Sequence, residues 1–166
     1  MEKKLEQFYE SWSEKSEKGI KEDIQSAMRK TNKIIDGIGQ NTSKIKIKSL
    51  IDFGCGYGTI LDIFAKRYQT DISFGFDFSN EAIKYANQHY SDKNTQYFKV
   101  PSLNIYENIE FIKSKIGTQK VDCILLIDLL EHIPNCKELI TELSKITTYF
   151  IIKLPLLSSN ESPSFS

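Results

Sequence analysis

Three glycines at alternate positions separate an apolar run from an amphipathic stretch. They are Gly54, Gly56 and Gly58, in the segment LIDFGCGYGTILDIF at residues 50–64. Because glycine has no Cβ, it adopts positive φ angles and lets a ligand touch the backbone. A glycine-rich turn between a strand and a helix is typical of sites that bind nucleotide-like cofactors. A tight turn that binds nothing is the alternative interpretation.

The spacing of these glycines differs from the dinucleotide fingerprint. That fingerprint is G-x-G-x-x-G. Its third glycine would fall at Thr59, whereas Gly58 comes one residue earlier. The difference disfavours a nicotinamide cofactor.

Three aspartates stand at the ends of apolar segments. Asp52 precedes the first glycine by two residues, and Asp77 and Asp128 close two later segments. Ligands of parallel sheets bind at the carboxyl ends of the strands, so we expect the three carboxylates to converge on one edge. A pyrophosphate would be repelled there by about 1 kcal/mol or more per close pair of charges. A cationic ligand would be attracted.

S-adenosylmethionine is such a ligand, because its sulfonium and ammonium groups are positive and its ribose offers two hydroxyls. An acid at the end of the second strand can accept both hydroxyl hydrogen bonds. Each is worth roughly 1.5–3 kcal/mol because the acceptor is charged. We assign Asp77 to this role.

Short apolar segments alternate with amphipathic ones along the chain. Helices between them are indicated by Ser79 as an N-cap and by a capping box of Asn135 and Glu138. Five alternations predict right-handed βαβ units, and hence an α/β, Rossmann-like three-layer sandwich with a mostly parallel open sheet. The expected strands are residues 47–53, 72–77, 95–100, 121–128 and 149–154.

Two amphipathic helices are expected before the first strand, one over residues 5–12 and one over residues 20–38. We therefore divide the chain into an N-terminal helical cap (1–40), a cofactor-binding core (41–157) and a Ser-rich tail (158–166). The composition of the tail predicts disorder.

Three segments together resemble a known family. LIDFGCGYGTIL, FGFDFSNEAIKYA and VDCILLIDLLEHIP, in this order and spacing, resemble signature regions of class I S-adenosylmethionine-dependent methyltransferases. The resemblance extends from about Leu50 to Pro155. It implies S-adenosylmethionine as cofactor and S-adenosylhomocysteine as product.

The resemblance also implies roles for individual residues. Asp52 would lie beneath the methionine part of the cofactor, Phe78 against its adenine, and Asp128 near the reacting methyl. The family usually supplies an acid after the third strand for the adenine amine. Pro101 and Ser102 stand there instead. The implied cofactor-binding residues are Asp52, Gly54, Cys55, Gly56, Tyr57, Gly58, Asp77, Phe78, Ser102, Leu103, Asp128 and Leu129.

His132 is the candidate general base, because an imidazole titrates near neutrality and this loop should face the methyl group. The alternative is that it only fixes the loop by a hydrogen bond. Asp128, Glu131 and His132 also form D-x-x-E-H, similar to a metal site of some relatives. Since no further histidine follows to complete a cage, we predict no metal.

The full family core has seven strands, and this chain offers five. We expect either a truncated chain or a reduced domain. In the second case a partner chain or a second copy would cover the exposed fifth strand, because bare edges invite pairing.

Composition limits the class of protein. Lys+Arg and Asp+Glu are both 22 in 166 residues. A duplex nucleic-acid binder usually shows a basic excess, so we expect none. Three scattered cysteines indicate a reducing compartment, and the chain lacks a secretory signal or a run of transmembrane length. We therefore expect a cytoplasmic protein of one domain with no membrane contact.

Taken together, these features predict a methyltransferase that acts on an O, N or C atom of a small molecule. One alternative is a catalytically inactive S-adenosylmethionine-binding module that serves as a partner subunit. A NAD-dependent oxidoreductase is a further alternative, disfavoured by Thr59 and by the three acids. The acceptor itself is not identified by the sequence.

Overall fold

The computed structural model describes residues 15–39, 46–102, 104–117 and 120–155. Five parallel strands form one sheet in the order β3-β2-β1-β4-β5. The strands are β1 (Ser49–Phe53), β2 (Ile72–Asp77), β3 (Thr95–Lys99), β4 (Val121–Ile127) and β5 (Thr147–Lys153). The helices are α2 (Glu17–Gly39), α3 (Thr59–Tyr68), α4 (Asn80–His89), α5 (Ile105–Ile116), α6 (Cys136–Ser144) and the short 3₁₀ helix η1 (Leu130–His132).

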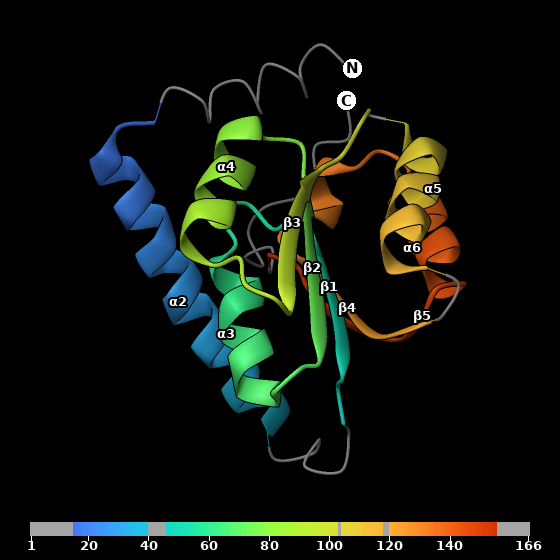
Figure 1. The fold of residues 1–166 in the computed structure, drawn as a ribbon, viewed down its shortest axis with the longest axis horizontal. Coiled ribbons are helices and arrows are strands. Elements are labelled where there is room, and N and C mark those ends of the chain that lie inside the picture. The colour runs from blue at the N-terminus through green and yellow to red at the C-terminus, as the bar shows by residue number, and fades with distance from the viewer. Residues whose placement is uncertain (1–14, 40–45, 103, 118–119, 156–166) are drawn as a thin grey trace, which may run out of the picture.

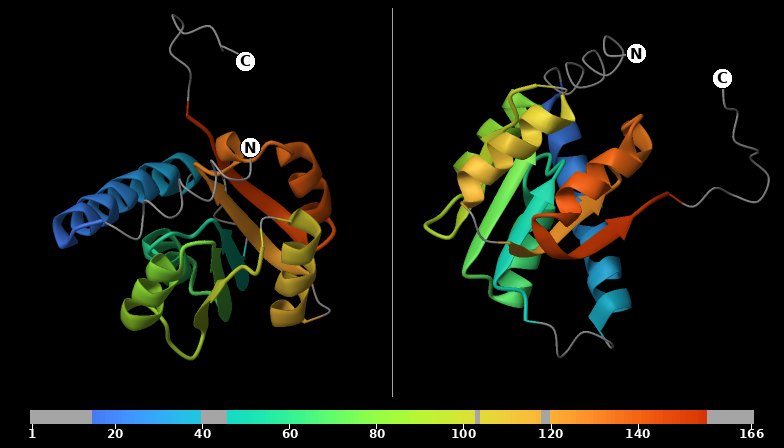
Figure 2. Two further views of the ribbon diagram at one scale, coloured as in Figure 1. Left: turned by 90° about the horizontal axis from the view of Figure 1, so that it is seen from above. Right: turned by 90° about the vertical axis from the view of Figure 1, so that its right-hand side faces the viewer.

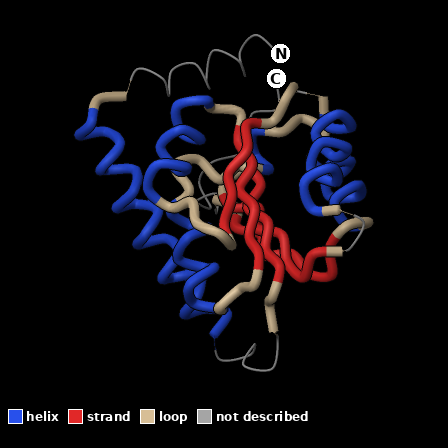
Figure 3. Tube along the Cα trace, viewed as in Figure 1, coloured by secondary structure: helices blue, strands red, loops and turns tan. Residues whose placement is uncertain are grey.

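The sheet is the middle of three layers. Helices α2, α3 and α4 lie on one side of the strands, and α5 and α6 lie on the other (Figures 1 and 3). The side view in Figure 2 has α5 and α6 in front of the sheet and α2 behind it. Since βαβ crossovers place helices on both faces of a parallel sheet, this arrangement confirms the predicted Rossmann-like sandwich.

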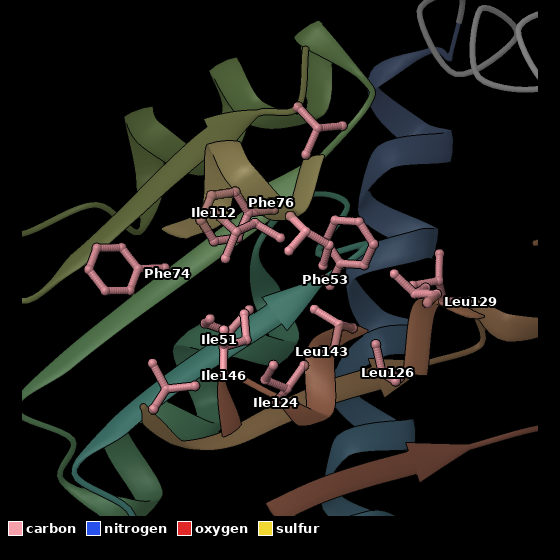
Figure 4. Close-up of a cluster of buried hydrophobic side chains, with 14 of the residues drawn as sticks. Ile51, Phe53, Phe74, Phe76, Ile112, Ile124, Leu126, Leu129, Leu143 and Ile146 are labelled. Atoms are coloured by element: carbon pink, nitrogen blue, oxygen red, sulfur yellow. The ribbon is translucent and has the colours of Figure 1, made fainter. Parts of the chain in front are cut away.

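Alternate residues of each strand serve different faces. On β1, Leu50 packs in the cluster on the α2–α4 side, whereas Ile51 and Phe53 pack in the cluster on the α5–α6 side. Figure 4 shows Ile51 and Phe53 within the second cluster, near Leu143 of α6. The side-chain period of two in a strand produces this division. It also places Asp52, next to Ile51, on the α2–α4 side.

Strand β4 is buried on both faces, as its almost unbroken apolar run predicts. Ile124 and Leu125 point to opposite clusters, and both are fully buried. β4 is an interior strand between β1 and β5, although the middle strand of the five is β1.

The start of β1 differs from the prediction by two residues. The N–H groups of Lys48 and Ser49 donate to Asp122 Oδ2, at 2.6 and 2.9 Å, and the N–H of Asp122 donates to Ser49 Oγ at 2.9 Å. A carboxylate therefore takes the first donors of the segment, and the ladder begins at Ser49.

The two predicted helix caps have different outcomes. Ser79 Oγ accepts a hydrogen bond from the Ala82 N–H at 3.2 Å, which confirms this cap. The capping box at Asn135 is wrong, because the Asn135 side chain makes no cap hydrogen bond. Its backbone carbonyl takes the Glu138 N–H at 3.0 Å instead. Helix α6 thus begins with a tight backbone turn.

Some predictions concern the ends of the chain. The helix expected over residues 5–12 and the tail expected over 158–166 lie outside the described residues. Strand β5 pairs with β4, and its Tyr149 and Ile152 side chains are 47% and 43% exposed. A partner on this edge stays a prediction. No helix in the described part combines the length and the apolar character needed to cross a bilayer.

Candidate functional site

The three glycines form the turn between β1 and α3 at the carboxyl edge of the sheet. Gly54, Gly56 and Gly58 have φ angles of 84°, 50° and 83°. A residue with a Cβ adopts this left-handed region at a cost of roughly 1–2 kcal/mol. The backbone path of the turn therefore accounts for glycine at all three positions.

Packing adds a second reason at two of them. A Cβ on Gly54 would lie 2.9 Å from Leu129 Cδ1, and one on Gly58 would lie 2.8 Å from Tyr97 Cε1. The protein's own side chains thus occupy the space beside these two glycines. Part of the glycine pattern is structural, as the tight-turn interpretation requires.

Four N–H groups of this turn already donate to acceptors within the protein. Loops that bind phosphate depend on N–H groups that point at the ligand. The hydrogen bonding here therefore agrees with the sequence prediction against a pyrophosphate. The acceptors are the Phe76 carbonyl for Gly54 and Cys55 at 2.8 and 3.1 Å, Asp77 Oδ2 for Gly56 at 2.8 Å and the Cys55 carbonyl for Gly58 at 2.9 Å.

Asp77, the last residue of β2, holds the turn in place. Its Oδ2 accepts from the Gly56 N–H and its Oδ1 accepts from the Ser79 N–H, each at 2.8 Å. Burial raises the pKa of this carboxyl, and the backbone hydrogen bonds oppose that rise. Each carboxylate oxygen has two lone pairs. Asp77 can therefore anchor the turn and still accept a hydroxyl from a ligand.

Asp52 is almost completely buried, with 1% of its surface exposed. Its Oδ2 has no hydrogen-bond partner among the described residues. Burial, together with the charge of Asp77, raises the pKa of Asp52 to about 8. An unpaired buried polar atom is costly. A donor with positive charge would satisfy Oδ2 and favour the ionised form.

Asp128 has a different environment, because two lysines pair with it. Lys30 of α2 contacts Oδ2, and Lys153 at the end of β5 contacts Oδ1. Partial burial raises the pKa of Asp128, but the hydrogen bonds and charges of the lysines outweigh this effect, and the net shift is downward. The φ of Asp128 is 51°, a left-handed value that Asp tolerates better than most residues.

These environments correct the electrostatic prediction. Three bare negative charges on one edge were expected, but the charge of Asp128 is neutralised by Lys30 and Lys153. The pKa of Asp52 near 8 leaves that group largely protonated at neutral pH. The lysines come from distant parts of the chain, and the burial of Asp52 arises from packing. The sequence at the strand ends indicates neither the lysine partners of Asp128 nor the burial of Asp52.

Other predicted residues lie around the same turn. Tyr57 is buried and makes an edge-to-face contact with Tyr85, with ring centroids 5.4 Å apart. Phe78 is partly buried against the α5–α6 cluster, and Leu129 is buried beside Gly54. Burial raises the pKa of the Cys55 thiol well above its usual value, which is consistent with a small apolar role.

The segment after β3 is fixed by a residue that sequence reasoning missed. Asn108, 2% exposed, donates from Nδ2 to the Ser102 carbonyl at 2.8 Å and accepts the Ser102 N–H at 3.4 Å. The signal in the sequence was that Asn108, a polar residue, stands beside Ile109 on the apolar face of α5. Leu103 lies outside the described residues.

His132 lies in η1, one turn beyond β4, and its side chain is exposed. Its backbone N–H donates to the Leu129 carbonyl at 3.0 Å. A catalytic role stays a prediction. Within the described ranges no group of three His, Cys, Asp or Glu residues is arranged to hold a metal ion, and the Asp128 oxygens of the D-x-x-E-H pattern face ammonium groups.

Several solved structures share this fold. The plantazolicin methyltransferase BpumL, in complex with a triazolic desmethylPZN analog and SAH, is 20% identical with a TM-score of 0.57; the match covers 89% of this chain and 58% of that one. The plantazolicin methyltransferase BamL, in a similar complex, is 21% identical with a TM-score of 0.52, over 88% and 47% of the two chains. The magnesium protoporphyrin IX methyltransferase from Synechocystis PCC 6803, with bound SAH, is 15% identical with a TM-score of 0.55, over 80% and 58%.

The present chain thus spans about half the length of these solved methyltransferases. A search among curated proteins found no significant match. A family model described as "Methyltransferase domain" matches residues 45–160, well over half of the chain. With the glycine turn, the strand-end acids and the sheet order β3-β2-β1-β4-β5 in place, the chain belongs to this methyltransferase-domain family.

Proposed function

We propose that this chain is an S-adenosylmethionine-dependent methyltransferase domain, with the cofactor along the carboxyl edge of β1, β2 and β4. The observation that carries the proposal is the buried Oδ2 of Asp52, which has no partner in the part of the chain that the structure describes. It lies beneath a turn whose N–H groups at Gly54, Cys55, Gly56 and Gly58 are already used. Such a site offers an acceptor for a cationic donor and little for a phosphate.

When bound, S-adenosylmethionine supplies a methyl group on a sulfonium, which is activated for displacement. In our proposal Asp52 accepts a hydrogen bond from the ammonium side of the cofactor, and Asp77 accepts from the ribose hydroxyls. Phe78 lies against the adenine. Ser102, held by Asn108, and Leu103 border the same ring.

We further propose that the acceptor is a small molecule methylated on O, N or C, and that Asp128 and Leu129 line its end of the site. Because the sulfonium is a good leaving group, alignment of the acceptor can supply most of the acceleration. A base such as His132 is required only if the acceptor must lose its proton early.

Calorimetric titration of the full chain with S-adenosylmethionine, S-adenosylhomocysteine and NAD tests the cofactor. We expect micromolar binding of the first two and none of NAD; a preference for NAD would contradict the proposal. Transfer of a radiolabelled methyl group to a metabolite extract tests catalysis. Tight cofactor binding without any labelled product would favour the inactive partner module.

A further inference from the structure

A group of three charged side chains, here named the lysine–aspartate cluster, lies at the carboxyl ends of β4 and β5. It consists of Lys30, Asp128 and Lys153. The three residues come from α2, the end of β4 and the end of β5. Each Asp128 oxygen contacts a different ammonium group, so both carboxylate oxygens are used.

The charges of the cluster do not balance. Two ammonium groups share one carboxylate, which leaves a net charge of +1. Other ion pairs, such as Lys66 with Asp62 and Lys145 with Glu142, join one cation to one anion, and their lysine side chains are 74% and 57% exposed. The side chains of Lys30, Lys153 and Asp128 are only 32%, 34% and 24% exposed. Partial burial reduces screening, so the excess positive charge acts more strongly on a nearby ligand.

The cluster is close to the glycine turn. Asp52 of β1 is opposite Leu125 of β4, and Asp128 directly follows the last residue of β4. Leu129, next to Asp128, would touch a Cβ placed on Gly54. A group held by the cluster would therefore lie beside the methyl-donor end of the proposed cofactor site.

We propose that Lys30 and Lys153 bind an anionic group of the methyl acceptor, a carboxylate or a phosphate, and that Asp128 holds the two lysines in position while competing with that group. This inference rests on the proposed methyltransferase function and narrows its acceptor to an anion. Lys30 lies on α2, so this helix contributes to acceptor binding as well as covering α3.

Asp128 distinguishes this proposal from a purely structural ion pair. If the cluster only fastens α2 to the sheet, removal of the carboxylate charge leaves two repelling ammonium groups and no gain in binding. If the cluster binds an anion, the substitution Asp128→Asn removes the competitor and raises the net charge to +2. Asn tolerates the left-handed φ of this position as well as Asp does.

The experiment uses the full chain and three probes of similar shape: benzoate, phenyl phosphate and the neutral benzamide. Saturation with S-adenosylhomocysteine is established first by calorimetry, so a failure of the proposed function is seen at that step, independently of the probes. Binding of each probe is then followed by amide chemical shifts of the ¹⁵N-labelled protein. We expect at least fivefold tighter binding of an anionic probe than of benzamide, with shifts at Asp128 and Lys153. The preferred anion identifies carboxylate or phosphate.

Variants complete the test. Lys30→Met and Lys153→Met should each weaken anion binding threefold or more and leave benzamide unchanged, whereas Lys30→Arg should retain anion binding. Lys66→Met, which removes a lysine from an ion pair elsewhere, is the matched control. Asp128→Asn should tighten anion binding at least twofold. Equal binding of benzamide and both anions, or weaker anion binding by Asp128→Asn, would overturn the proposal.

Discussion

The two halves of the carboxyl edge use the same residue type in opposite ways. At the ends of β1 and β2, Asp52 and Asp77 are buried and have no lysine partner among the described residues, and their pKa values are raised by burial. At the end of β4, Asp128 is paired with Lys30 and Lys153, and its pKa is lowered. The presence of an aspartate at a strand end thus does not by itself determine its charge state. Its depth and its partners decide whether it is a neutral acid or a paired anion.

This difference in charge suggests that the two halves of the carboxyl edge bind different ligands. The β1–β2 half holds acceptor atoms for a positively charged donor, whereas the lysine–aspartate cluster carries excess positive charge for an anionic acceptor. A methyl donor and a methyl acceptor of opposite charge could then lie side by side without competing for one subsite. Each prediction below tests one half of this comparison or the contact between them.

The largest effect is expected for Asp52→Asn. The pKa of Asp52 is about 8 in the fold and 3.8 in the unfolded reference, so between these values only the folded state holds the proton. The free energy of unfolding of the wild type should therefore fall as pH rises from about 4 to about 8. Asn cannot ionise, and the variant should be more stable than the wild type by about 2–5 kcal/mol at pH 8.

Urea unfolding at pH 5, 6.5 and 8 measures this difference. Because the pKa of Asp77 is also raised, the wild type alone does not isolate Asp52; the difference between the two proteins does. If the difference in free energy of unfolding between the two proteins stayed constant across this range, Asp52 would already be ionised in the fold. Asp52 and Asp128 would then both be anions, and the two halves of the edge would not differ in this respect.

The substitution Asp77→Ala should weaken S-adenosylmethionine binding by about 2–4 kcal/mol, since it removes charged hydrogen bonds to the ribose. It also frees the N–H groups of Gly56 and Ser79, which the carboxylate now accepts. Calorimetric titration measures the affinity. Asp71→Ala, at the opposite end of β2 with an exposed side chain paired to Lys48, is the matched control and should bind normally. Unchanged affinity in Asp77→Ala would remove Asp77 from the site.

The fold could be predicted from the sequence because local signals agreed with one another. Strand β2 has the predicted bounds, since apolar residues and flanking turn residues marked both ends. Ser79 was predicted as a cap because its side chain acts within three residues. The capping box at Asn135 was predicted wrongly, because the Glu138 N–H donates to the backbone carbonyl of Asn135 and not to its side chain.

The electrostatics of the site could not be predicted in the same way. The positions of Asp52, Asp77 and Asp128 followed from strand order, but Lys30 lies 98 residues from Asp128 and carries no signal within α2. Lys153 lies 25 residues away, as the last residue of β5. Side-chain partners across such separations depend on packing between elements, which a residue pattern does not specify.

The contact between the two halves is tested by Gly54 and Leu129. Gly54→Ala should lower the free energy of unfolding by about 1–3 kcal/mol, because φ is 84° and the new Cβ would lie 2.9 Å from Leu129 Cδ1. Adding Leu129→Ala should cost less in this variant than in the wild type, and a double-mutant cycle measures the coupling. Gly37→Ala, where a Cβ meets nothing within 4 Å, should be neutral or stabilising. If the effects of the two substitutions on the free energy of unfolding were strictly additive, the Leu129 side chain would move away from the new Cβ at no cost.

The smallest effect is expected for Lys30→Met, which should lower the free energy of unfolding by about 0.5–1 kcal/mol. The effect is small because the Lys30–Asp128 ion pair is partly exposed and salt screens it. Its pH dependence has the opposite sign to that of Asp52. The pKa of Asp128 is lowered in the fold, so the lysines stabilise the fold above the usual value of 3.8, and this contribution is lost as pH falls below it. The difference between wild type and Lys30→Met in urea unfolding should thus shrink from pH 7 to pH 3. A difference that stayed constant down to pH 3 would mean that Lys30 stabilises α2 by packing of its stem, and the lysine–aspartate cluster would then lose its electrostatic basis.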